Sequence, residues 1–343
     1  MNLPASTRFL LIGALFLAFC SFLESDCDDG RKIRLMFYNV ENLFDPDNDP
    51  ATDDEEFLPS GTRGWTRSRY LNKLNAVYKA VVSAGDGNLP AICGFSEVEN
   101  RKVLEDLLTL TPLNRNNIYS IVHEESTDIR GIDVCLIYRK DLLSLENYRY
   151  YFPEDLLRSG FRSRSVLYTK WIWCGKTFHL FLNHWPSRRG GVVATEKARM
   201  SFARMVKHKA DSIKRADGDC DAIIIAGDLN CDPGAPEEKI FSGQADGPYL
   251  NMIVPLLTKG RGTYKYNGLW EAPDQVIISK SMISGCEGLK TGLNDIRIID
   301  KPELLVKDKK YPGYKPFSTY SGFSYRGGFS DHLPVVIDLH CSR

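Results

Sequence analysis

The sequence lacks an excess of charge of either sign. Its 343 residues contain 44 Lys and Arg and 44 Asp and Glu, so the formal net charge is zero. A surface built for tight, nonspecific binding of nucleic acid usually carries a strong positive charge. The balance therefore argues against such a surface, but it does not exclude a nuclease, which needs only a local phosphate site.

The sequence also lacks any Cys-X-X-Cys pair among its nine cysteines, so zinc-ribbon chemistry has no support. Cys93, Cys135 and Cys174 lie in apolar, strand-like runs. Free cysteine in such runs usually serves as a small core residue. Export would permit disulfides, but the sequence alone assigns none.

The N-terminus has the pattern of a targeting segment. Arg8 precedes an almost uncharged apolar run over residues 9–19, and polar residues follow. The run is short for a membrane span and is typical of a secretory leader. We therefore predict that residues 1–26 are a signal peptide or lipoprotein leader and that the protein is exported to the periplasm, cell surface or medium. Cys20 ends the run, so membrane contact through a lipid on Cys20 is open, as is an uncleaved anchor.

No internal repeat or low-complexity linker interrupts the chain. Seven strand-like apolar runs occur, at residues 33–38, 91–95, 134–138, 178–182, 222–226, 275–278 and 335–337. Residues 70–82 and 195–213 have apolar side chains at helical spacing. This interleaving predicts one α/β domain over residues 27–343. The continuous apolar strands predict sheets that are buried on both faces.

Polar residues suited to metal binding follow two of the early strands. Asn39 and Glu41 are two positions apart, so on an extended chain they share a face. Glu97 directly follows another apolar run, and Mg²⁺ prefers one or two such carboxylates with several waters. The simpler interpretation is that these residues cap strand ends or the helices that follow.

Two later clusters add an imidazole and a further carboxylate. Asn183 and His184 end one strand, and Asp228 and Asn230 follow the next, after Gly227. A carboxylate beside a carboxamide can orient a nucleophilic water, while a glycine permits a close backbone approach. A core histidine and an Asx turn are the simpler alternatives.

The last two clusters are Asp274, at the start of a strand, and Asp331-His332, just before the terminal apolar run. Asp274 could orient an imidazole by accepting its N–H, and His332 could transfer protons near neutral pH. Six polar sites at strand ends are hard to explain as independent caps. In stacked sheets such ends can converge on one cleft.

In this order, Gly227-Asp228-Leu229-Asn230 and Ser330-Asp331-His332, with Asn39 and Glu97 upstream, resemble the endonuclease/exonuclease/phosphatase superfamily. The resemblance runs from about Ile33 to Leu339. It implies a four-layer α/β-β/α sandwich of two packed mixed sheets with outer helices. It also implies hydrolysis of phosphoric esters that depends on Mg²⁺, with Mn²⁺ as a possible substitute.

The resemblance also implies roles for the matched residues. Glu97 is expected to be the principal metal ligand, with Asn39, Glu41 and Asp331 near the metal. Asp228 is expected to activate or position the attacking water, and Asn230 to hold the phosphate. His332 is expected to pair with Asp274 and act as a general acid or base.

His184 matches a second histidine of the deoxyribonuclease and sphingomyelinase branches, which the repair-endonuclease branch lacks. We expect Asp133 to orient His184, and Asn183 and Arg164 to contact the phosphate. Which histidine is the acid stays open.

The predicted function is an exported, Mg²⁺-dependent nuclease that acts as a monomer without a stable protein partner. Alternatives are a phospholipid hydrolase, a small-phosphodiester or phosphomonoester hydrolase, and a non-catalytic binding protein on the same fold.

Overall fold

The structure is a computed structural model that describes residues 31–188, 191–217, 222–243, 247–285 and 288–341. The predicted leader, residues 1–26, and Cys20 lie outside the described residues. Within the described ranges, no helix is both long and apolar enough to cross a membrane.

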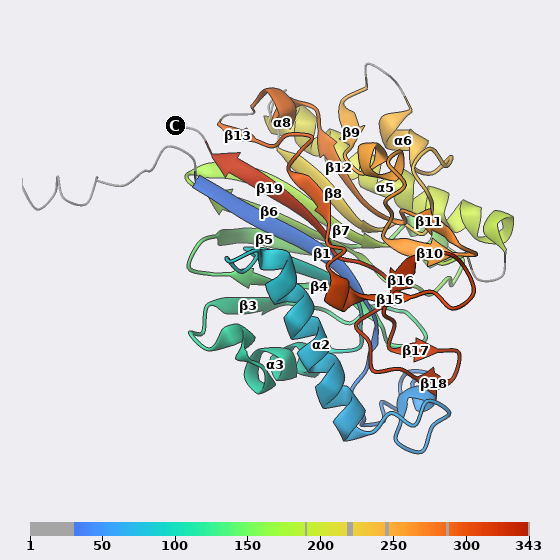
Figure 1. The fold of residues 1–343 in the computed structure, drawn as a ribbon. Helices are drawn as coiled ribbons and strands as arrows, with labels where there is room; N and C mark the ends of the chain where they lie inside the picture. The colour runs from blue at the N-terminus through green and yellow to red at the C-terminus, as the bar shows by residue number, and fades with distance from the viewer. Residues whose placement is uncertain (1–30, 189–190, 218–221, 244–246, 286–287, 342–343) are drawn as a thin grey trace, which may run out of the picture.

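Two mixed β-sheets form the centre of the molecule (Figure 1). The first sheet has the order β13-β19-β1-β2-β4-β3, with β14 also paired to β19. Its strands are β1 (Arg31–Leu43), β2 (Ile92–Val98), β3 (Tyr119–Val122), β4 (Asp133–Arg139), β13 (Leu289–Lys290), β14 (Ile296–Ile298) and β19 (Val335–Cys341). The pair β1 and β2 is parallel, while β1 and β19 are antiparallel, so the sheet is mixed.

The second sheet has the order β5-β6-β7-β8-β12-β9. Its strands are β5 (Ser144–Tyr151), β6 (Val166–Trp173), β7 (Lys176–His184), β8 (Ile223–Asp228), β9 (Tyr249–Asn251) and β12 (Asp274–Ser279). Here β7 and β8 are parallel, and β12 is antiparallel to β8. All seven predicted strands occur, as β1, β2, β4, β7, β8, β12 and β19.

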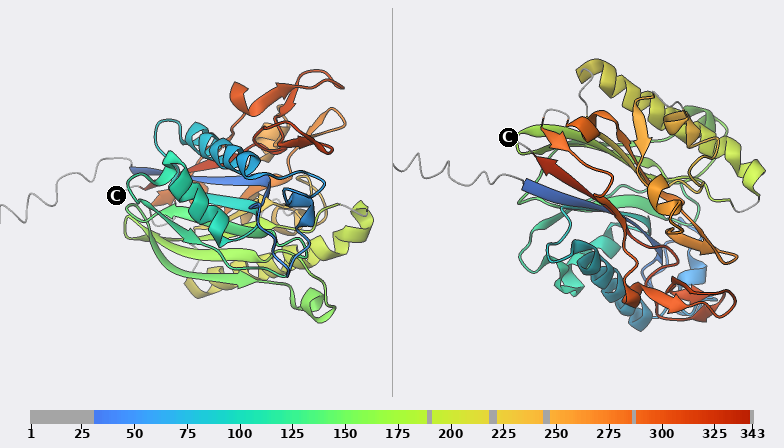
Figure 2. Two further views of the ribbon diagram at one scale, coloured as in Figure 1. Left: turned by 90° about the horizontal axis from the view of Figure 1, so that it is seen from below. Right: turned by 45° about the horizontal axis from the view of Figure 1, so that its top comes forward.

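Helices cover the outer faces of the two sheets, as Figure 2 shows. The helices α2 (Arg67–Gly85) and α3 (Arg101–Leu110) lie on the first sheet, and α5 (Val192–Asp217) lies on the second. Both predicted helices occur, as α2 and α5, and α3 is an addition. The arrangement confirms the predicted four-layer sandwich.

Short helices and hairpins connect these layers. They are η1 (Glu55–Phe57), η2 (Pro112–Asn114), α4 (Glu154–Arg158), α6 (Lys239–Ser242), α7 (Val254–Leu257), α8 (Ser281–Ser284), η3 (Pro302–Leu304) and the hairpins β10 (Tyr264–Tyr266) with β11 (Leu269–Glu271), β15 (Leu305–Lys307) with β16 (Tyr314–Pro316) and β17 (Tyr320–Ser321) with β18 (Ser324–Tyr325). The sequence patterns predicted none of these hairpins.

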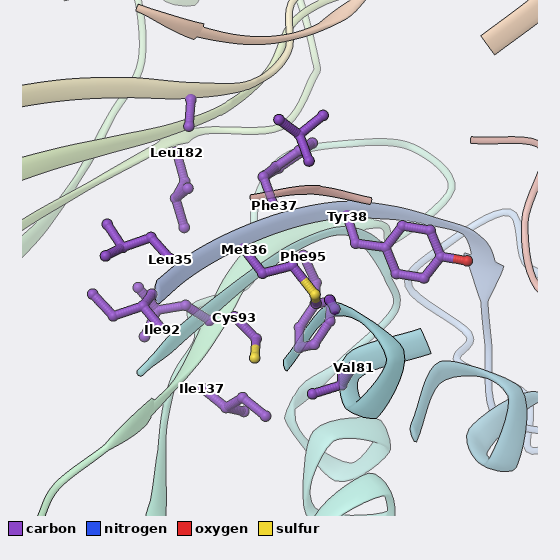
Figure 3. Packing of buried hydrophobic residues seen from close by; sticks show 14 of the residues in the cluster. Leu35, Met36, Phe37, Tyr38, Val81, Ile92, Cys93, Phe95, Ile137 and Leu182 are labelled. Carbon is purple, nitrogen blue, oxygen red and sulfur yellow. The ribbon is translucent and has the colours of Figure 1, made fainter. Parts of the chain in front are cut away.

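Strand β1 is buried on both faces, as its continuous apolar run predicts. Leu35 and Phe37 lie on the side that faces Leu182 of the second sheet, and Met36 lies on the side of Val81 in α2 (Figure 3). Each of these side chains belongs to one hydrophobic cluster that joins both sheets and α2. Burial of this apolar surface holds the layers together.

Glycine allows close contacts between neighbouring strands and between sheets. A Cβ atom on Gly227 would lie 2.1 Å from the carbonyl oxygen of Asn183 on the adjacent strand, and its φ is +144°. A Cβ on Gly94 would lie 2.6 Å from Leu182 Cδ1 of the opposite sheet. The predicted close approach at Gly227 is therefore confirmed.

Replacing Gly227 by alanine should lower the free energy of unfolding by about 3 kcal/mol or more, because the change combines an unfavourable φ with a backbone clash. Gly160→Ala is the matched control: its φ is +74° and a Cβ there meets no atom within 4 Å. The control should cost about 1 kcal/mol. Denaturant unfolding measures both, and equal losses would show that the clash is relieved by a shift of β7.

Candidate active site

Three adjacent strands of the second sheet align three predicted catalytic residues. His184 at the end of β7 pairs with Asp228 at the end of β8, and Asp228 pairs with Asp274 at the start of β12. Because β7 and β8 are parallel and β12 is antiparallel to them, two strand ends and one strand start meet at the same edge. The register therefore brings an imidazole and two carboxylates together.

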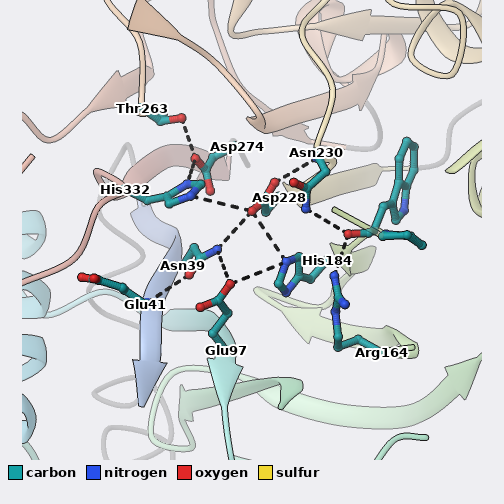
Figure 4. A network of polar contacts seen from close by, with 12 residues as sticks. Asn39, Glu41, Glu97, Arg164, His184, Asp228, Asn230, Thr263, Asp274 and His332 are labelled. Carbon is teal, nitrogen blue, oxygen red and sulfur yellow. Dashed lines mark hydrogen bonds and ion pairs between the residues drawn. The ribbon is translucent and has the colours of Figure 1, made fainter. Parts of the chain in front are cut away.

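The first sheet supplies Asn39 and Glu97 to the same edge (Figure 4). Asn39 Nδ2 donates a hydrogen bond of 3.0 Å to Asp228 Oδ2 and lies 3.5 Å from Glu97 Oε1. Glu97 has a φ of +64° and sits where the register of β2 and β4 shifts. Left-handed backbone at a non-glycine residue is uncommon and is often found at functional sites.

Asp228 lies at the centre of the cluster (Figure 4). Its Oδ2 is 3.7 Å from His184 Nε2 and 4.0 Å from His332 Nε2, while its Oδ1 accepts a 2.9 Å hydrogen bond from Asn230 N. Burial and the charge of Asp274 raise the pKa of Asp228 to about 6. The two imidazole distances are too long for direct hydrogen bonds, and they suit a small ligand atom placed between the groups.

His332 is held by Asp274, as predicted. Its Nδ1 lies 2.7 Å from Asp274 Oδ2, which also accepts a 2.5 Å hydrogen bond from Thr263 Oγ1. The Tyr264 ring packs against the imidazole, with ring centroids 4.9 Å apart. Burial alone would lower the pKa of His332, but Asp274 outweighs burial and raises it well above the ordinary value. His332 is thus held in its charged form with Nε2 directed at Asp228.

His184 has the opposite electrostatic character. Burial, with contributions from the charges of Arg164 and Arg130, lowers the pKa of His184 well below its ordinary value. Its Nδ1 is buried and has no hydrogen-bond partner among the described residues. We expected Asp133 to orient His184, and this expectation is wrong, because Asp133 bonds His123 and Ser126 instead. A neutral imidazole can still donate or accept one hydrogen bond through Nε2.

Asp133 does not reach His184, and instead it pairs with a histidine that the sequence analysis missed. Its Oδ2 lies 3.0 Å from His123 Nε2, and its Oδ1 accepts a hydrogen bond from Ser126 N. His123, Glu125 and Asp133 also form one of two groups whose potential ligand atoms lie within 4.8 Å of one another. Asp133 therefore orients the imidazole of His123 and not that of His184.

Glu41 is a second correction. The residues Glu41 and Asn42 both have a φ of +53°, so the two-residue period of an extended strand fails after Asn39. The Glu41 carboxylate turns away from Glu97 and accepts hydrogen bonds from Thr319 N at 2.6 Å and Tyr320 N at 3.4 Å. Glu41 thus fixes the segment before the β17–β18 hairpin rather than facing the cluster.

Lys73 of α2 is a buried cation that the sequence analysis also missed. Its ammonium donates hydrogen bonds of 2.5 Å to Thr319 Oγ1 and 2.6 Å to Phe329 O. Burial lowers its pKa, and the carboxylates of Glu41, Asp331 and Glu97 oppose that shift. A lysine on the apolar face of α2, three residues after the buried Tyr70, was the available signal.

Asp331 lies beside these carboxylates, as predicted. Burial raises its pKa to about 7, and the charges of Glu41 and Glu97 add to the shift, whereas His332 and Lys73 oppose it. Carboxylates crowded in this way repel one another, and a bound cation relieves the repulsion.

Glu97 and Asp331 fit a divalent cation as carboxylate ligands. Among the described residues, Glu97 Oε1 has polar neighbours only at 3.5 Å, Asn39 Nδ2, and at 3.9 Å, His184 Nε2, so its lone pairs are available to a ligand. Carboxylate oxygen is what hard cations such as Mg²⁺ prefer, whereas Asn39 Oδ1, which we expected near the metal, accepts a hydrogen bond of 3.0 Å from Glu41 N. The second group within 4.8 Å, Asp228 with Asp274 and His332, is already engaged in the hydrogen bonds described above.

Two of the residues predicted to contact the phosphate are buried and bonded within the protein. Asn183 is fully buried, and its side chain bonds Phe181 O, Ala226 O and Trp185 Nε1. Arg164 is buried, and it bonds Asp128 Oδ2 at 3.0 Å and Trp185 O at 2.7 Å, while its Nε has no hydrogen-bond partner among the described residues. These bonds anchor both side chains at the strand end beside His184.

Asn230 lies next to Asp228, at the rim of the cluster. Its Nδ2 donates 2.9 Å to Trp185 O, its φ is +50°, and its side chain is partly exposed. Arg188 lies close enough to Asp228 and Tyr264 to interact with them electrostatically, although it also pairs with Glu271 and Asp232.

The raised pKa of His332 makes stability depend on pH. The folded state binds its proton more tightly than the unfolded state, so the pair with Asp274 stabilises fully below the unfolded pKa of about 6.5. That contribution is lost as pH rises through the folded pKa. In chelator, the difference in unfolding free energy between wild type and Asp274→Asn should shrink with rising pH, by about 1.4 kcal/mol for each unit of the original shift. A difference that does not change with pH would contradict a charged His332.

Removing the charge of Lys73 should make the fold depend more on the cation. Lys73→Met leaves the three carboxylates without their buried counter-charge and leaves Phe329 O without its donor, so the unfolding free energy in chelator should fall by about 2–4 kcal/mol. The rise in Tm on adding Mg²⁺ should be larger than in wild type, because the site is more negative. Lys79→Met, on the exposed face of the same helix, should change neither quantity. An Mg²⁺-induced Tm rise equal to that of wild type would show that the ammonium does not influence the cation site.

Comparison with known proteins gives the family and the fold. A model described as the Endonuclease/Exonuclease/phosphatase family matches residues 34–341. No curated protein matches the sequence. An endonuclease/exonuclease/phosphatase family protein from Bacteroides thetaiotaomicron is similar in structure, with a TM-score of 0.57, 15% identity and coverage of 91% of this chain and 96% of that chain.

Two further solved structures have names that specify an activity or a bound molecule. D. rerio TDP2 complexed with a single-strand DNA product matches with a TM-score of 0.55 and 13% identity, covering 90% of this chain and 98% of that one. A mannosyl-6-phosphatase of Bacteroides thetaiotaomicron VPI-5482 matches with a TM-score of 0.54 and 16% identity, covering 90% and 99%. At these identities the structures show the shared fold. The family match, which spans nearly all described residues, shows that the chain belongs to the endonuclease/exonuclease/phosphatase family of metal-dependent phosphoester hydrolases.

Proposed function

We propose that the protein is an exported, Mg²⁺-dependent phosphodiesterase, with nucleic acid as its first candidate substrate. The observation that carries the proposal is the position of Asp228 between His184, His332 and Asn39, beside the oxygen ligands of Glu97 and Asp331. Hydrolysis of a phosphoester needs an activated water, a proton donor and a positive charge near the phosphoryl oxygens. Asp228 is placed to activate the water, His332 is placed to donate the proton, and Glu97 and Asp331 offer a site for the positive charge. The leader pattern of residues 1–26 supports export.

Asp228 is the group suited to orient and deprotonate the attacking water. Its Oδ2 lies between the two imidazoles, 3.7 Å from His184 Nε2 and 4.0 Å from His332 Nε2, and a hydrogen bond from Asn39 fixes its direction. Asn230 N binds the other oxygen, so each carboxylate oxygen accepts one hydrogen bond and keeps a second lone pair for the water. A Mg²⁺ held by Glu97 and Asp331 would neutralise charge on the phosphoryl oxygens.

The two imidazoles have different roles in the proposed reaction. His332 is charged and faces the cluster through Nε2, so it can donate a hydrogen bond or a proton to the phosphoryl group. His184 is neutral, so its Nε2 orients the phosphate or the water by hydrogen bonding rather than by carrying a charge. This assignment gives His332 the role of the acid.

Hydrolysis of a small phosphoester is the second candidate, and one observation favours it. Two cations near the cluster that could contact a nucleic-acid backbone are engaged within the protein: Arg164 with Asp128, and Arg188 with Glu271 and Asp232. Arg189 lies outside the described residues. A site that contacts a single phosphate is sufficient for a small diester or a monoester, such as a sugar phosphate.

A substrate panel separates these candidates. The full chain, supplied with Mg²⁺, would be assayed against single-stranded DNA, RNA, sphingomyelin, bis-p-nitrophenyl phosphate and mannose 6-phosphate. A nuclease that contacts several phosphates should lose affinity steeply with salt, whereas a single-phosphate enzyme should show a shallow slope. Excess chelator should abolish turnover of whichever substrate is cleaved. Full activity in chelator would refute the metal-dependent mechanism.

Asp228→Asn provides the matched catalytic control for the panel. The substitution keeps the shape of the side chain but removes the charge that polarises water, so kcat should fall roughly 10²-fold or more. The unfolding transition should be retained, since the two residues are nearly isosteric. A variant with wild-type kcat would assign water activation to another group.

A further inference from the structure

Two thiols that the catalytic cluster does not use lie side by side at the opposite end of the sheets. Cys174 is in the turn between β6 and β7, and Cys341 is the last residue of β19. The Cys341 thiol lies within hydrogen-bonding reach of the Cys174 thiol. Both cysteines are partly exposed. Among the described residues, Cys93, Cys135 and Cys231 are buried.

The backbone independently places these two residues together. Arg31, the first residue of β1, pairs directly with Cys341 across the antiparallel ladder. The Arg31 guanidinium also reaches Cys174, with 3.9 Å between Nη1 and Sγ. Arg31 thus lies opposite Cys341 through its backbone and reaches the Cys174 sulfur through its side chain. Sulfur atoms this close need only small side-chain rotations to reach bonding distance.

The turn that carries Cys174 is rigid and well suited to present the thiol. Cys174 and Gly175 have φ values of +53° and +71°, the pattern of a tight two-residue hairpin turn. The short turn leaves Cys174 little freedom to move away from β19. Cys341 is likewise fixed, because β19 pairs with β1 along its length.

The local charges also suit thiol chemistry. Burial and the neighbouring thiol raise the pKa of Cys341, while Lys176 and Arg31 act in the opposite direction. Cationic groups stabilise the thiolate that disulfide exchange requires. Partial exposure gives an external disulfide access to the pair.

We propose that Cys174 and Cys341 form a disulfide that joins the two sheets at the edge remote from the catalytic cluster. The oxidant is an external disulfide such as oxidised glutathione. One cysteine thiolate attacks it and releases one external thiol, and the second thiolate then attacks the mixed disulfide and releases the other. Two cysteine protons are lost, one S–S bond forms, and the external S–S bond is reduced to two thiols.

The bond would link β19 of the first sheet to the β6–β7 hairpin of the second, where the Arg31 side chain already contacts Cys174. It closes a long loop between residues 174 and 341, and a disulfide across a long loop restricts the unfolded chain most strongly. His184 is at the other end of β7, roughly 25 Å away by strand length, so the bond does not touch the proposed chemistry. The proposal does not depend on the substrate.

The test uses the full chain, purified in reductant and equilibrated in glutathione buffers of reducing and oxidising composition. Free thiols are then alkylated and the protein is digested without reduction for mass spectrometry. The oxidised sample should contain a cross-linked peptide pair with Cys174 and Cys341, while Cys93, Cys135 and Cys231 should remain thiols. Alkylation of both Cys174 and Cys341 in the oxidised sample, or pairing of either with another cysteine, would overturn the proposal.

Thermal unfolding tests the same disulfide independently of the mass spectrometry. Wild type should have a Tm higher by about 5 °C in the oxidising buffer than in the reducing buffer. Cys174→Ser and Cys341→Ser should each abolish this difference, and Cys231→Ala, the control, should keep it. Loss of the redox-dependent difference in Cys231→Ala alone would assign the disulfide to a different pair.

Discussion

The hydrogen bond from Asn39 to Asp228 joins the two sheets at the place where the chemistry is located. It requires both sheets to be at the correct separation, because Asn39 lies on β1 of the first sheet and Asp228 ends β8 of the second. Gly94 permits that separation, since a Cβ there would lie 2.6 Å from Leu182 Cδ1 of the opposite sheet, and Gly227 permits the close approach of β8 to β7. The packing of the core thus sets the geometry of the site.

The cluster concentrates negative charge that the fold must balance. Asp228 and Asp331 have raised pKa values because burial disfavours their charged forms. His332 and the buried Lys73 provide counter-charge from opposite sides. A divalent cation at Glu97 would complete the balance and polarise the phosphoryl oxygens. The same electrostatics therefore links stability, cation binding and catalysis.

Sequence patterns predicted the central strands and both long helices, while the family resemblance implied the four-layer sandwich. The resemblance also implied the contact of Asp274 with His332, which the structure contains, and strand pairing places Asp274 opposite Asp228. Prediction failed where the backbone leaves regular geometry. The left-handed residues Glu41 and Asn42 reverse the expected direction of the Glu41 side chain, and no periodicity reveals such a bulge.

Prediction from the sequence also failed where a side chain bonds a residue far away in the chain. Asp133 and Arg164 are residue types suited to a catalytic site, but Asp133 bonds His123 and Arg164 bonds Asp128. Lys73 lies on a helix far from the motifs and reaches the site only through the segment from Thr319 to Phe329. Such contacts depend on tertiary packing, which local sequence does not encode.

The central claim is that water held by Asp228 attacks phosphorus directly and in line with the leaving oxygen. The most direct measurement is the stereochemical course of hydrolysis of a phosphorothioate diester of single configuration at phosphorus, in isotopically labelled water. A single in-line displacement predicts inversion at phosphorus, with the label in the phosphoryl product. Retention of configuration would reveal a covalent enzyme intermediate, and it would contradict this account of the site.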